Sequence, residues 1–379
     1  MSTCLPLPAV PRRPAAIAFV LVSYVPDAPA GIERAVAALA AGLRARGDRA
    51  LILTAAAQPQ PDPGVIQLGA LPLTFPCDDI TLRQAVHLNR AAITAELSQT
   101  LTRQQADAVI YADALWGLGL TAASVQSPAR PVLAVHVIGH DRDLTPALAA
   151  ASRVIVPSAS VLADATAHGY DTAAWHTVPN PLLIDPAHVR RPGKAQREQL
   201  RLHGPVAVIA RLGAEKGVTG LLGAAVPGNR PLHVVLAPAG FETVPGSQQR
   251  LAAECARLAA AANGAIWPPL AWQQVPAFLA SAAVTMVPSE RETFGNVAAE
   301  SMSAGTPVIA YATGNLPALL GPGGVLVPAH AGPGALWRAA LDLLADPVRY
   351  WQMCRDAYCQ SRNYRPARIA DAFLKAVHA

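Results

Sequence analysis

The sequence predicts an α/β chain made of two doubly wound domains, each with a parallel sheet covered by helices. Short β-rich runs alternate with Ala- and Leu-rich stretches, and several runs are continuously apolar, as expected when both faces of a sheet are covered. The alternation stops around residues 179–204 and then begins again. A length of 379 residues, 52% hydrophobic and 15% charged, suffices for two buried cores.

The strand-forming runs of the first half are spaced so that helices fit between them. They are Ile17–Val25, Ala50–Thr54, Val65–Leu68, Ala108–Tyr111, Val132–Val137 and Arg153–Val156. The clearest helix is Gly31–Arg46, where apolar residues from Ile32 to Leu43 recur at the spacing that forms one buried stripe. Gly47 follows at the position where a glycine commonly ends a helix.

A break separates the two halves. Pro179 and Pro181 interrupt regular structure, and Asp185–Arg201 is polar, charged and proline-bearing, which is typical of a linker. Strand-forming runs then resume at Val206–Ala210, Leu232–Ala237, Ala265–Trp267, Val284–Val287, Pro307–Ala310 and Val325–Val327. We therefore predict a flexible tail over residues 1–14, a first domain over 15–182, a linker over 183–204 and a second domain from residue 205.

Charge and cysteine content restrict the classes of ligand and site to be expected. The formal net charge is +5, but the basic residues are scattered and do not alternate with aromatic ones, so we expect no binding to nucleic acid. A modest positive field favours an anionic ligand such as a diphosphate. Five cysteines without a C-x-x-C pair indicate neither a disulfide framework nor a zinc site, and they fit a reducing compartment.

The N-terminal region superficially resembles a signal peptide, because Arg12 and Arg13 precede the apolar run Ile17–Val22. That run is too short to span a bilayer and lacks a small-residue cleavage site. No other apolar stretch is long enough to cross a membrane. The sequence therefore predicts a cytoplasmic protein without stable membrane insertion.

The strongest functional signal is Pro288–Glu300, which follows a strand and opens a helix. Glu292 lies before the helix and Glu300 inside it, and eight helical residues rise about 12 Å, close to the separation of the two sugars in a nucleotide sugar. Glu300 could accept hydrogen bonds from a ribose diol. The alternative is a surface Glu300 and a Glu292 that interacts with the helix dipole. First-turn N–H groups that could seat a diphosphate belong to Gly295, Asn296 and Val297.

A second signal follows the first strand of the second domain. Arg211 and Lys216 lie five residues apart on a strand-to-helix loop. Both can therefore reach one diphosphate, Arg211 as a planar fork and Lys216 as a point charge. The alternative is a solvated charged loop.

Two more segments follow strands of the first domain. Gly31 begins the first long helix and can bring backbone N–H groups close to a phosphate, although the segment lacks the G-x-G-x-x-G dinucleotide fingerprint. His136 and His140 follow a central strand, where a structural role is the usual one for a single histidine.

The segment Pro288–Glu300 resembles the E-x7-E signature of the retaining glycosyltransferases of family four. These have the GT-B fold, an α/β architecture of two facing Rossmann-like αβα domains with an interdomain cleft. The resemblance implies that Glu292 contacts hydroxyls of the donor sugar and that Glu300 holds the ribose. Arg211 and Lys216 match the R-x4-K pair of the family, which implies stabilisation of the departing diphosphate without a metal.

Two further motifs extend the resemblance to nearly the full chain. The loop before Gly31 is similar to the Gly-Gly-x-Glu loop of the family, with Ala30 in place of the first glycine and Glu33 as a member without an assigned role. His136 matches a family histidine near the donor sugar better than His140 does.

The resemblance also assigns roles to the domains. Residues 15–182 would bind the acceptor, and residues 205–361 would bind the nucleotide sugar. Residues 362–379 would form a terminal helix that crosses back to the first domain.

Acidic residues on loops after first-domain strands bear on the acceptor. The residues considered are Asp27, Asp113, Asp141 and Asp143, with the aromatic residues Tyr24, Tyr111 and Trp116. On a basic protein they would suit a cationic, polyhydroxylated acceptor such as an aminocyclitol. The alternative is a set of solvated loops with core aromatics. Phe294-Gly295-Asn296 and Gly314-Asn315-Leu316-Pro317 also resemble glycosyltransferases that act on 2-deoxystreptamine in aminoglycoside antibiotic biosynthesis.

Taken together, these features predict a retaining hexosyltransferase. It would move a glucose, glucosamine or N-acetylglucosamine unit from a nucleotide sugar, UDP-linked by the resemblance alone, to a small polar acceptor, with 2-deoxystreptamine as one candidate. We expect no cofactor and no metal, and either a monomer or a homodimer. The alternatives are a nucleotide-sugar epimerase of the same fold and a glycosyltransferase with a lipid or cell-envelope acceptor. A two-domain sugar-binding protein and a degenerate partner subunit are the non-enzymatic alternatives.

Overall fold

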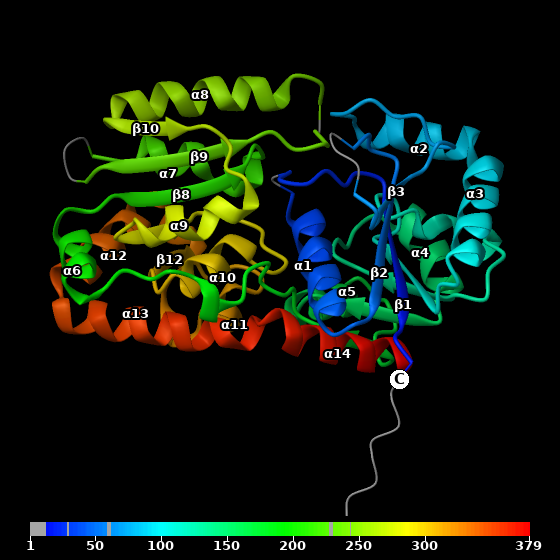
Figure 1. Ribbon diagram of the computed structural model, residues 1–379. Coiled ribbons are helices and arrows are strands. Elements are labelled where there is room, and N and C mark those ends of the chain that lie inside the picture. The colour runs from blue at the N-terminus through cyan, green and yellow to red at the C-terminus, as the bar shows by residue number, and fades with distance from the viewer. Residues whose placement is uncertain (1–12, 29, 59–61, 227–229, 243) are drawn as a thin grey trace, which may run out of the picture.

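The computed structural model describes residues 13–28, 30–58, 62–226, 230–242 and 244–379. Most of the predicted tail, residues 1–14, lies outside this part of the chain. Two α/β lobes stand side by side, with α1 of the first lobe facing the second (Figure 1). The prediction of two domains, each with a parallel sheet, is confirmed.

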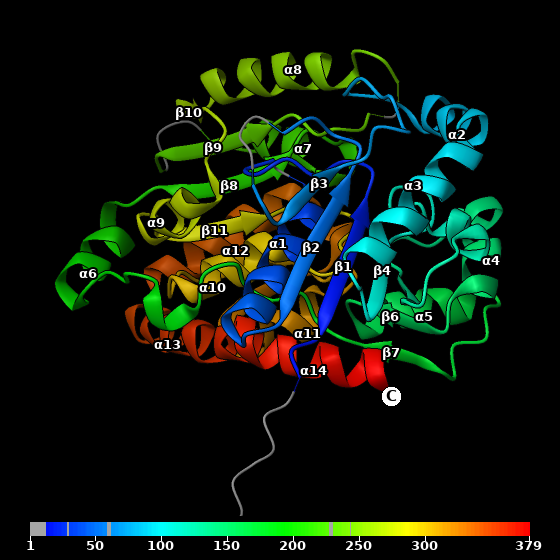
Figure 2. The same cartoon turned by 45° about the vertical axis from the view of Figure 1, so that its right-hand side comes forward.

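The first lobe is built on a sheet of seven strands in the described part of the chain, in the order β3-β2-β1-β4-β5-β6-β7, with every pairing parallel. Figure 2 shows β2, β1 and β4 next to one another in this sheet. The strands are β1 Ala16–Leu21, β2 Arg49–Thr54, β3 Val65–Gln67, β4 Ala108–Ala112, β5 Arg130–Ala134, β6 Arg153–Val156 and β7 Trp175–Thr177. The fully buried β1 is an interior strand of this sheet, between β2 and β4, as its continuous apolar run predicts.

Helices cover this sheet on both sides. They are α1 Gly31–Ala45, α2 Asp79–Leu88, α3 Arg90–Arg103, α4 Asp141–Ala150 and α5 Ala159–Ala167. The first of them confirms the predicted helix, and Gly47 beyond its end has the positive φ of 85° that glycine adopts without strain.

The second lobe has a sheet of six strands within the described residues, in the order β10-β9-β8-β11-β12-β13. Its strands are β8 Val206–Arg211, β9 Leu232–Ala237, β10 Gly264–Trp267, β11 Val284–Val287, β12 Val308–Tyr311 and β13 Gly324–Val327. The helices of the second half are α6 Lys194–His203, α7 Val218–Gly223, α8 Ser247–Ala261, α9 Val275–Ala280, α10 Asn296–Ser303, α11 Leu316–Leu320, α12 Pro333–Ala345, α13 Pro347–Ser361 and α14 Pro366–His378. None of the helices in the described residues combines the length and apolar character that crossing a bilayer requires.

The segment predicted as a linker, 183–204, is more ordered than its polar composition indicated. Its second half forms α6, and Arg197 on that helix is buried in the second lobe. The Arg197 guanidinium donates to the carbonyl oxygens of Ala282 and Ala304 at 2.8 and 3.1 Å. The charged side chain of Arg197 is therefore part of the core, because its N–H groups donate to carbonyl oxygens there.

The last helix, α14, belongs structurally to the first lobe. It runs beneath α1 (Figure 1), and Phe373 stacks on Phe19 of β1 with ring centroids 5.9 Å apart. Gly42 of α1 allows the close approach, because a Cβ there would lie 2.9 Å from the Pro366 carbonyl oxygen. The chain thus crosses from the second lobe back to the first.

Candidate functional site

The seam between the lobes is formed by the N-terminal ends of α1 and α10. The Asn296 side-chain amide, at the start of α10, donates to the Gly31 carbonyl oxygen at 2.9 Å. Asn180, between the lobes, donates to the Asn296 side-chain oxygen at 3.3 Å. Ser158 of the first lobe donates to the Thr293 carbonyl oxygen at 2.6 Å. The predicted phosphate-binding helix starts therefore face each other.

Glycines shape the loop that carries Glu292. Gly295 has a φ of 104°, which only glycine adopts readily. A Cβ at Gly314 would overlap the Glu292 carbonyl, so these two backbone segments lie in direct contact. The Asn315 backbone N–H donates to the Glu292 carbonyl oxygen at 3.1 Å, and its side-chain amide donates to the Phe294 carbonyl oxygen at 3.0 Å. The backbone of the loop is thus fixed on both sides of Glu292.

The start of α10 leaves backbone donors available. Its first intrahelical bond runs from the Ala299 N–H to the Gly295 carbonyl oxygen. The N–H groups of Asn296 and Val297 precede that bond and have no acceptor in the helix. Oriented N–H groups of this kind favour an anion.

The two predicted cations lie on the loop after β8, and each contacts a carboxylate. Lys216 Nζ lies 2.9 Å from Glu292 Oε2, and both side chains are largely buried. Arg211 Nη2 lies 2.5 Å from Glu215 Oε1. The sequence therefore identified a pair, Lys216 and Glu292, that the fold brings into contact across 76 residues of chain.

Glu300 has a partner that the sequence analysis did not identify. Arg34 of α1 donates from Nη1 to both carboxylate oxygens, at 2.8 and 2.6 Å. Only 8% of the Glu300 side chain and 11% of the Arg34 side chain are exposed. Burial raises the pKa of Glu300, and the charge of Arg34 opposes that rise.

Glu33, next to Arg34, is also buried. Burial raises its pKa to about 7, while hydrogen bonds from its own backbone and from Ser23, and the positive charge of Arg211, act in the opposite direction. Of these two adjacent residues of α1, Arg34 contacts the second lobe at Glu300, whereas Glu33 accepts a hydrogen bond from Ser23 of its own lobe.

His136 lies just after β5, beside the seam. It lines a small apolar cavity together with Val36 of α1 and Asn180. Burial lowers its pKa to about 4, so the imidazole is neutral near pH 7. His140 instead packs edge-on against Trp116, with ring centroids 5.1 Å apart.

Asp113 organises the loop that carries His136. It has a positive φ of 94° and is buried, and burial raises its pKa to about 7. Its carboxylate accepts from the backbone N–H of Ala114 at 3.2 Å and of His136 at 3.3 Å. Asp113 thus stabilises the loops that follow β4 and β5, and its carboxyl group does not face solvent.

The other acidic residues considered for the acceptor also have partners within the protein. Asp27 accepts from the Trp272 backbone N–H at 2.6 Å, across the seam. Tyr170 donates to Asp141, and Arg83 forms a forked ion pair with Asp143, with the shortest contact at 2.6 Å. The structure therefore does not assemble these carboxylates into one open acidic cluster, and an acceptor role for Asp27, Asp113 and Asp141 remains a prediction.

Hydrophobic contacts also join the lobes at the opposite end of the seam. Phe241, after β9, packs edge-on against Phe75 of the first lobe, with centroids 5.8 Å apart. The backbone N–H of Cys77 donates to the Gly240 carbonyl oxygen at 3.1 Å, so the two lobes share a short parallel bridge. The predicted cleft is therefore closed by direct contacts at several points.

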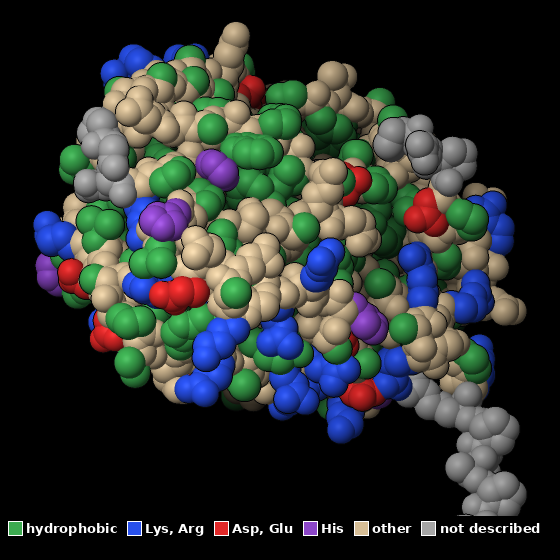
Figure 3. Space-filling view, turned by 60° about the vertical axis from the view of Figure 1, so that its left-hand side comes forward, with side chains coloured by type: hydrophobic (Ala, Val, Ile, Leu, Met, Phe, Trp, Pro, Cys, Tyr) green, Lys and Arg blue, Asp and Glu red, His purple; other side chains and the backbone are tan. Residues whose placement is uncertain are grey.

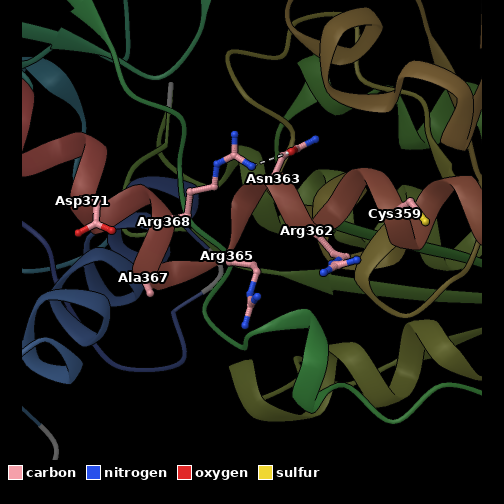
Figure 4. Close-up of a pocket in the computed structure, with 7 residues that line it drawn as sticks. All are labelled: Cys359, Arg362, Asn363, Arg365, Ala367, Arg368 and Asp371. Carbon is pink, nitrogen blue, oxygen red and sulfur yellow. Dashed lines mark hydrogen bonds between the residues drawn. The ribbon is translucent and has the colours of Figure 1, made fainter. Parts of the chain in front are cut away.

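A larger hollow lies elsewhere, at the junction of α13 and α14 (Figure 4). Its volume is about 570 Å³, and Arg362, Arg365 and Arg368 line it. Arg365 forms an ion pair with Asp185 at 2.9 Å, and Arg368 donates to Asn363 at 3.0 Å. Lys and Arg side chains gather along this lower edge of the molecule (Figure 3). The ion pair of Arg365 thus connects the segment between the lobes, at Asp185, to the start of α14, away from the predicted catalytic groups.

No group of three or more His, Cys, Asp and Glu side chains suited to a metal ion occurs among the residues that the structure describes. The cysteines in that part of the chain, Cys77, Cys255, Cys354 and Cys359, are free thiols.

Two family models match the chain. One, described as "Glycosyl transferase 4-like domain", matches residues 30–181, and the other, "Glycosyl transferases group 1", matches residues 205–346.

Curated relatives are similar over part of their length. A D-inositol 3-phosphate glycosyltransferase of Streptomyces avermitilis is 34% identical over 158 residues, 40% of this chain and 33% of that protein. One of Acidothermus cellulolyticus is 32% identical over 200 residues, 48% of this chain and 44% of that protein. The chain therefore aligns with less than half the length of these relatives.

Solved structures match over nearly the whole chain. A sucrose-phosphate synthase from Thermosynechococcus elongatus has a TM-score of 0.73 at 21% identity, covering 96% of this chain and 98% of that one. Anabaena HepE, in complex with UDP and glucose, has a TM-score of 0.74 at 19% identity, covering 96% and 100%. At these identities the likeness shows a shared fold.

Proposed function

We propose, from the premise that this chain belongs to the GT-B glycosyltransferases of group 1, that it moves a sugar from a nucleotide-sugar donor to a small polyhydroxylated acceptor. The observation that supports this most is the Lys216–Glu292 ion pair of 2.9 Å beside the start of α10. This pair places a cation and a carboxylate next to the free N–H groups at the start of α10, at the seam between the lobes.

In this proposal the donor lies along the start of α10. The diphosphate would accept from the N–H groups of Asn296 and Val297 and would draw Lys216 and Arg211 away from their carboxylates. Glu292 would then be available to hydroxyls of the donor sugar, and Glu300 to the ribose. The complex of HepE with UDP and glucose supports a UDP-linked hexose as the first donor to test.

The chemical step would be assisted by charge stabilisation and positioning. As the bond between the anomeric carbon and the diphosphate breaks, Lys216 and Arg211 stabilise the negative charge of the leaving group. The acceptor hydroxyl attacks from the face that the diphosphate leaves and gives its proton to the departing phosphate oxygen, so the configuration is retained. Neutral His136 would lie near the reacting sugar as a hydrogen-bonding group, and no covalent intermediate on a carboxylate is required.

We propose a ring polyol as the acceptor. The relatives named D-inositol 3-phosphate glycosyltransferases support a cyclitol, as does the resemblance to 2-deoxystreptamine glycosyltransferases. Asp27, Asp141 and Asp143 already have partners within the protein, so their charges favour neither an aminated nor a phosphorylated cyclitol. A phosphorylated and an aminated cyclitol are therefore competing substrates for one assay.

The test is a transfer assay that pairs UDP-glucose and UDP-N-acetylglucosamine with D-inositol 3-phosphate, 2-deoxystreptamine and fructose 6-phosphate. The expected result is acceptor-dependent release of UDP and a product with the anomeric configuration of the donor, determined by NMR. Conversion of the donor in the absence of any acceptor would indicate an epimerase instead. Binding without turnover on a wider donor and acceptor panel would contradict the proposal.

We further propose that turnover needs no divalent metal, since Lys216 and Arg211 supply the positive charge that a metal would otherwise provide. With an active donor and acceptor pair, excess EDTA should leave the initial rate within about twofold of the untreated enzyme. Loss of activity with EDTA, restored by Mg²⁺ or Mn²⁺, would contradict this part.

A further inference from the structure

The Arg34–Glu300 ion pair joins the two lobes at a carboxylate that the proposed function assigns to the donor. Both Glu300 oxygens accept from Arg34 Nη1, and only 8% of the Glu300 side chain is exposed. A ribose diol therefore has little access to this carboxylate while Arg34 remains in place. The Arg34 guanidinium also lies over the ring of Trp272, another second-lobe residue, at 6.0 Å from the ring centroid.

The neighbouring residue, Glu33, makes no such contact. It is 5% exposed and accepts a hydrogen bond from Ser23 of its own lobe, while Arg211 has its own carboxylate partner, Glu215. Arg34 is therefore the residue on this turn of α1 that offers a charged group, its guanidinium, to the proposed ribose ligand Glu300.

We propose that Arg34 acts as an internal substitute for the ribose of the donor, which holds the lobes together until a nucleotide sugar displaces it. This inference rests on the proposed function for the identity of the displacing ligand. Arg34 is a positioning residue in this account, because it acts through Glu300. We call the Arg34–Glu300 contact the α1 latch.

The remaining seam contacts are mostly neutral and would separate with the latch. They include the hydrogen bonds of Asn296 to Gly31 and of Trp272 to Asp27, and the bridge at Cys77. The Arg34–Glu300 contact differs because removing one partner leaves a buried, unpaired charge in the closed form only. Loss of Arg34 therefore penalises closure, whereas in an open form water can hydrate Glu300.

Competition of this kind lowers the apparent affinity for the donor. When only a fraction of the protein is competent to bind, the apparent Kd is the intrinsic Kd divided by that fraction. Weakening the closed state raises the competent fraction, so the latch predicts tighter binding in a variant that has lost an ionic contact.

The test compares Arg34→Met with a matched control, Arg83→Met. Arg83 also forms a partly buried ion pair, with Asp143, but both residues belong to the first lobe. Arg34→Lys, which keeps the charge but replaces the planar guanidinium by a more strongly hydrated ammonium, serves as a second variant with an intermediate effect expected. Far-UV circular dichroism establishes that each variant is folded.

Small-angle X-ray scattering without ligand gives the first measurement. Arg34→Met should have a larger radius of gyration than the unsubstituted chain, and Arg83→Met should not. An unchanged radius in both Arg34 variants overturns the proposal.

Calorimetric titration with UDP, GDP and ADP gives the second measurement. The nucleotide that binds the unsubstituted chain should bind Arg34→Met about tenfold more tightly, and Arg83→Met with unchanged affinity. Equal or weaker binding to Arg34→Met overturns the proposal. If none of the three nucleotides binds any variant, the proposed function fails, and the scattering result alone decides whether Arg34 closes the seam.

Discussion

At the scale of single residues, the candidate site consists of carboxylates and cations, several of whose partners come from distant parts of the chain. Glu292 meets Lys216, and Glu300 meets Arg34 from the other lobe. The sequence allowed prediction of the residues in E-x7-E and R-x4-K, because their spacing along a loop and a helix is local. Arg34 was not identified, because its role depends on how the lobes face each other. The one feature of the sequence that could have pointed to Arg34 was its position directly after Glu33, at the start of the predicted helix Gly31–Arg46.

Replacing the lysine of the pair should impair transfer without unfolding the protein. Lys216→Ala should lower kcat by about 10²–10³-fold, because one charge that stabilises the leaving diphosphate is lost. Glu292→Gln should also lower turnover strongly. The measurement is the initial rate of UDP release with an active donor and acceptor pair. Lys194→Ala, at an exposed position on α6, is the control and should retain the full rate.

Rates of Lys216→Ala and Glu292→Gln equal to that of the unsubstituted enzyme would remove both residues from the catalytic assignment. Melting temperatures of the two variants identify any loss of rate that comes from unfolding.

The buried Glu33 should make stability depend on pH. Its folded-state pKa of about 7 is above the ordinary value of 4.5, so the folded state holds the proton more tightly than the unfolded state does. The resulting stabilisation is fully present below about pH 4.5 and is lost as the pH rises through 7. Glu33→Gln lacks this titrating group. The difference between its free energy of unfolding and that of the unsubstituted chain should therefore rise by about 2–3 kcal/mol, in favour of the variant, from pH 5 to 8.

Urea denaturation of both proteins across this pH range measures the difference, and the other titrating groups, such as Asp113 and His136, contribute equally to each. A difference that stays constant from pH 5 to 8 would show that the Glu33 carboxyl is ionised throughout.

At the scale of helices and strands, periodicity was sufficient where packing follows a simple rule. The predicted strands are all present, because continuous apolar runs are typical of parallel strands covered on both faces. The expected first strand was too long, since β1 ends at Leu21 and the following residues turn toward the seam. β7 was missed because Trp175–Thr177 is only three residues long and not apolar throughout. In α6, buried Arg197 concealed a helix within polar sequence.

Two helical glycines provide a matched test of how closely α14 packs. A Cβ at Gly42 would lie 2.9 Å from the Pro366 carbonyl oxygen, whereas a Cβ at Gly220 of α7 would have its nearest neighbour at 3.9 Å. Gly42→Ala should lower the free energy of unfolding by about 1–3 kcal/mol through overpacking. Gly220→Ala should raise it by about 0.5–1 kcal/mol, because alanine favours the helix.

Chemical denaturation of the two variants beside the unsubstituted chain decides this prediction. A stabilising Gly42→Ala would mean that α1 and α14 have room to separate.

At the scale of the whole molecule, the sequence predicted two facing α/β domains but not the direct contacts that close the seam between them. The two-domain arrangement follows from strand alternation and the break near residue 180, both visible in one dimension. Closure depends on contacts such as Phe241 against Phe75, which pair residues of different domains. Their side chains carry no local pattern that marks them as interdomain partners.

Net charge affects the whole molecule's encounter with an anionic donor. A chain of charge +5 should attract a nucleotide sugar more strongly at low ionic strength, when the Debye length exceeds about 10 Å. Raising the salt from about 0.05 to 0.5 M should therefore increase KM for the donor several-fold and change kcat little. Steady-state kinetics in sodium chloride measures this, and a KM independent of salt would contradict it.

The crossing of α14 has a consequence for how the protein is made. Phe373, Leu374 and Val377, near the C-terminus, belong to the same hydrophobic cluster as Ile17 and Phe19 of the first strand. A ribosome delivers these late residues only after both sheets have been translated. The lobe synthesised first therefore keeps an uncovered apolar surface until α14 has also been translated, and only then can its interior be completed.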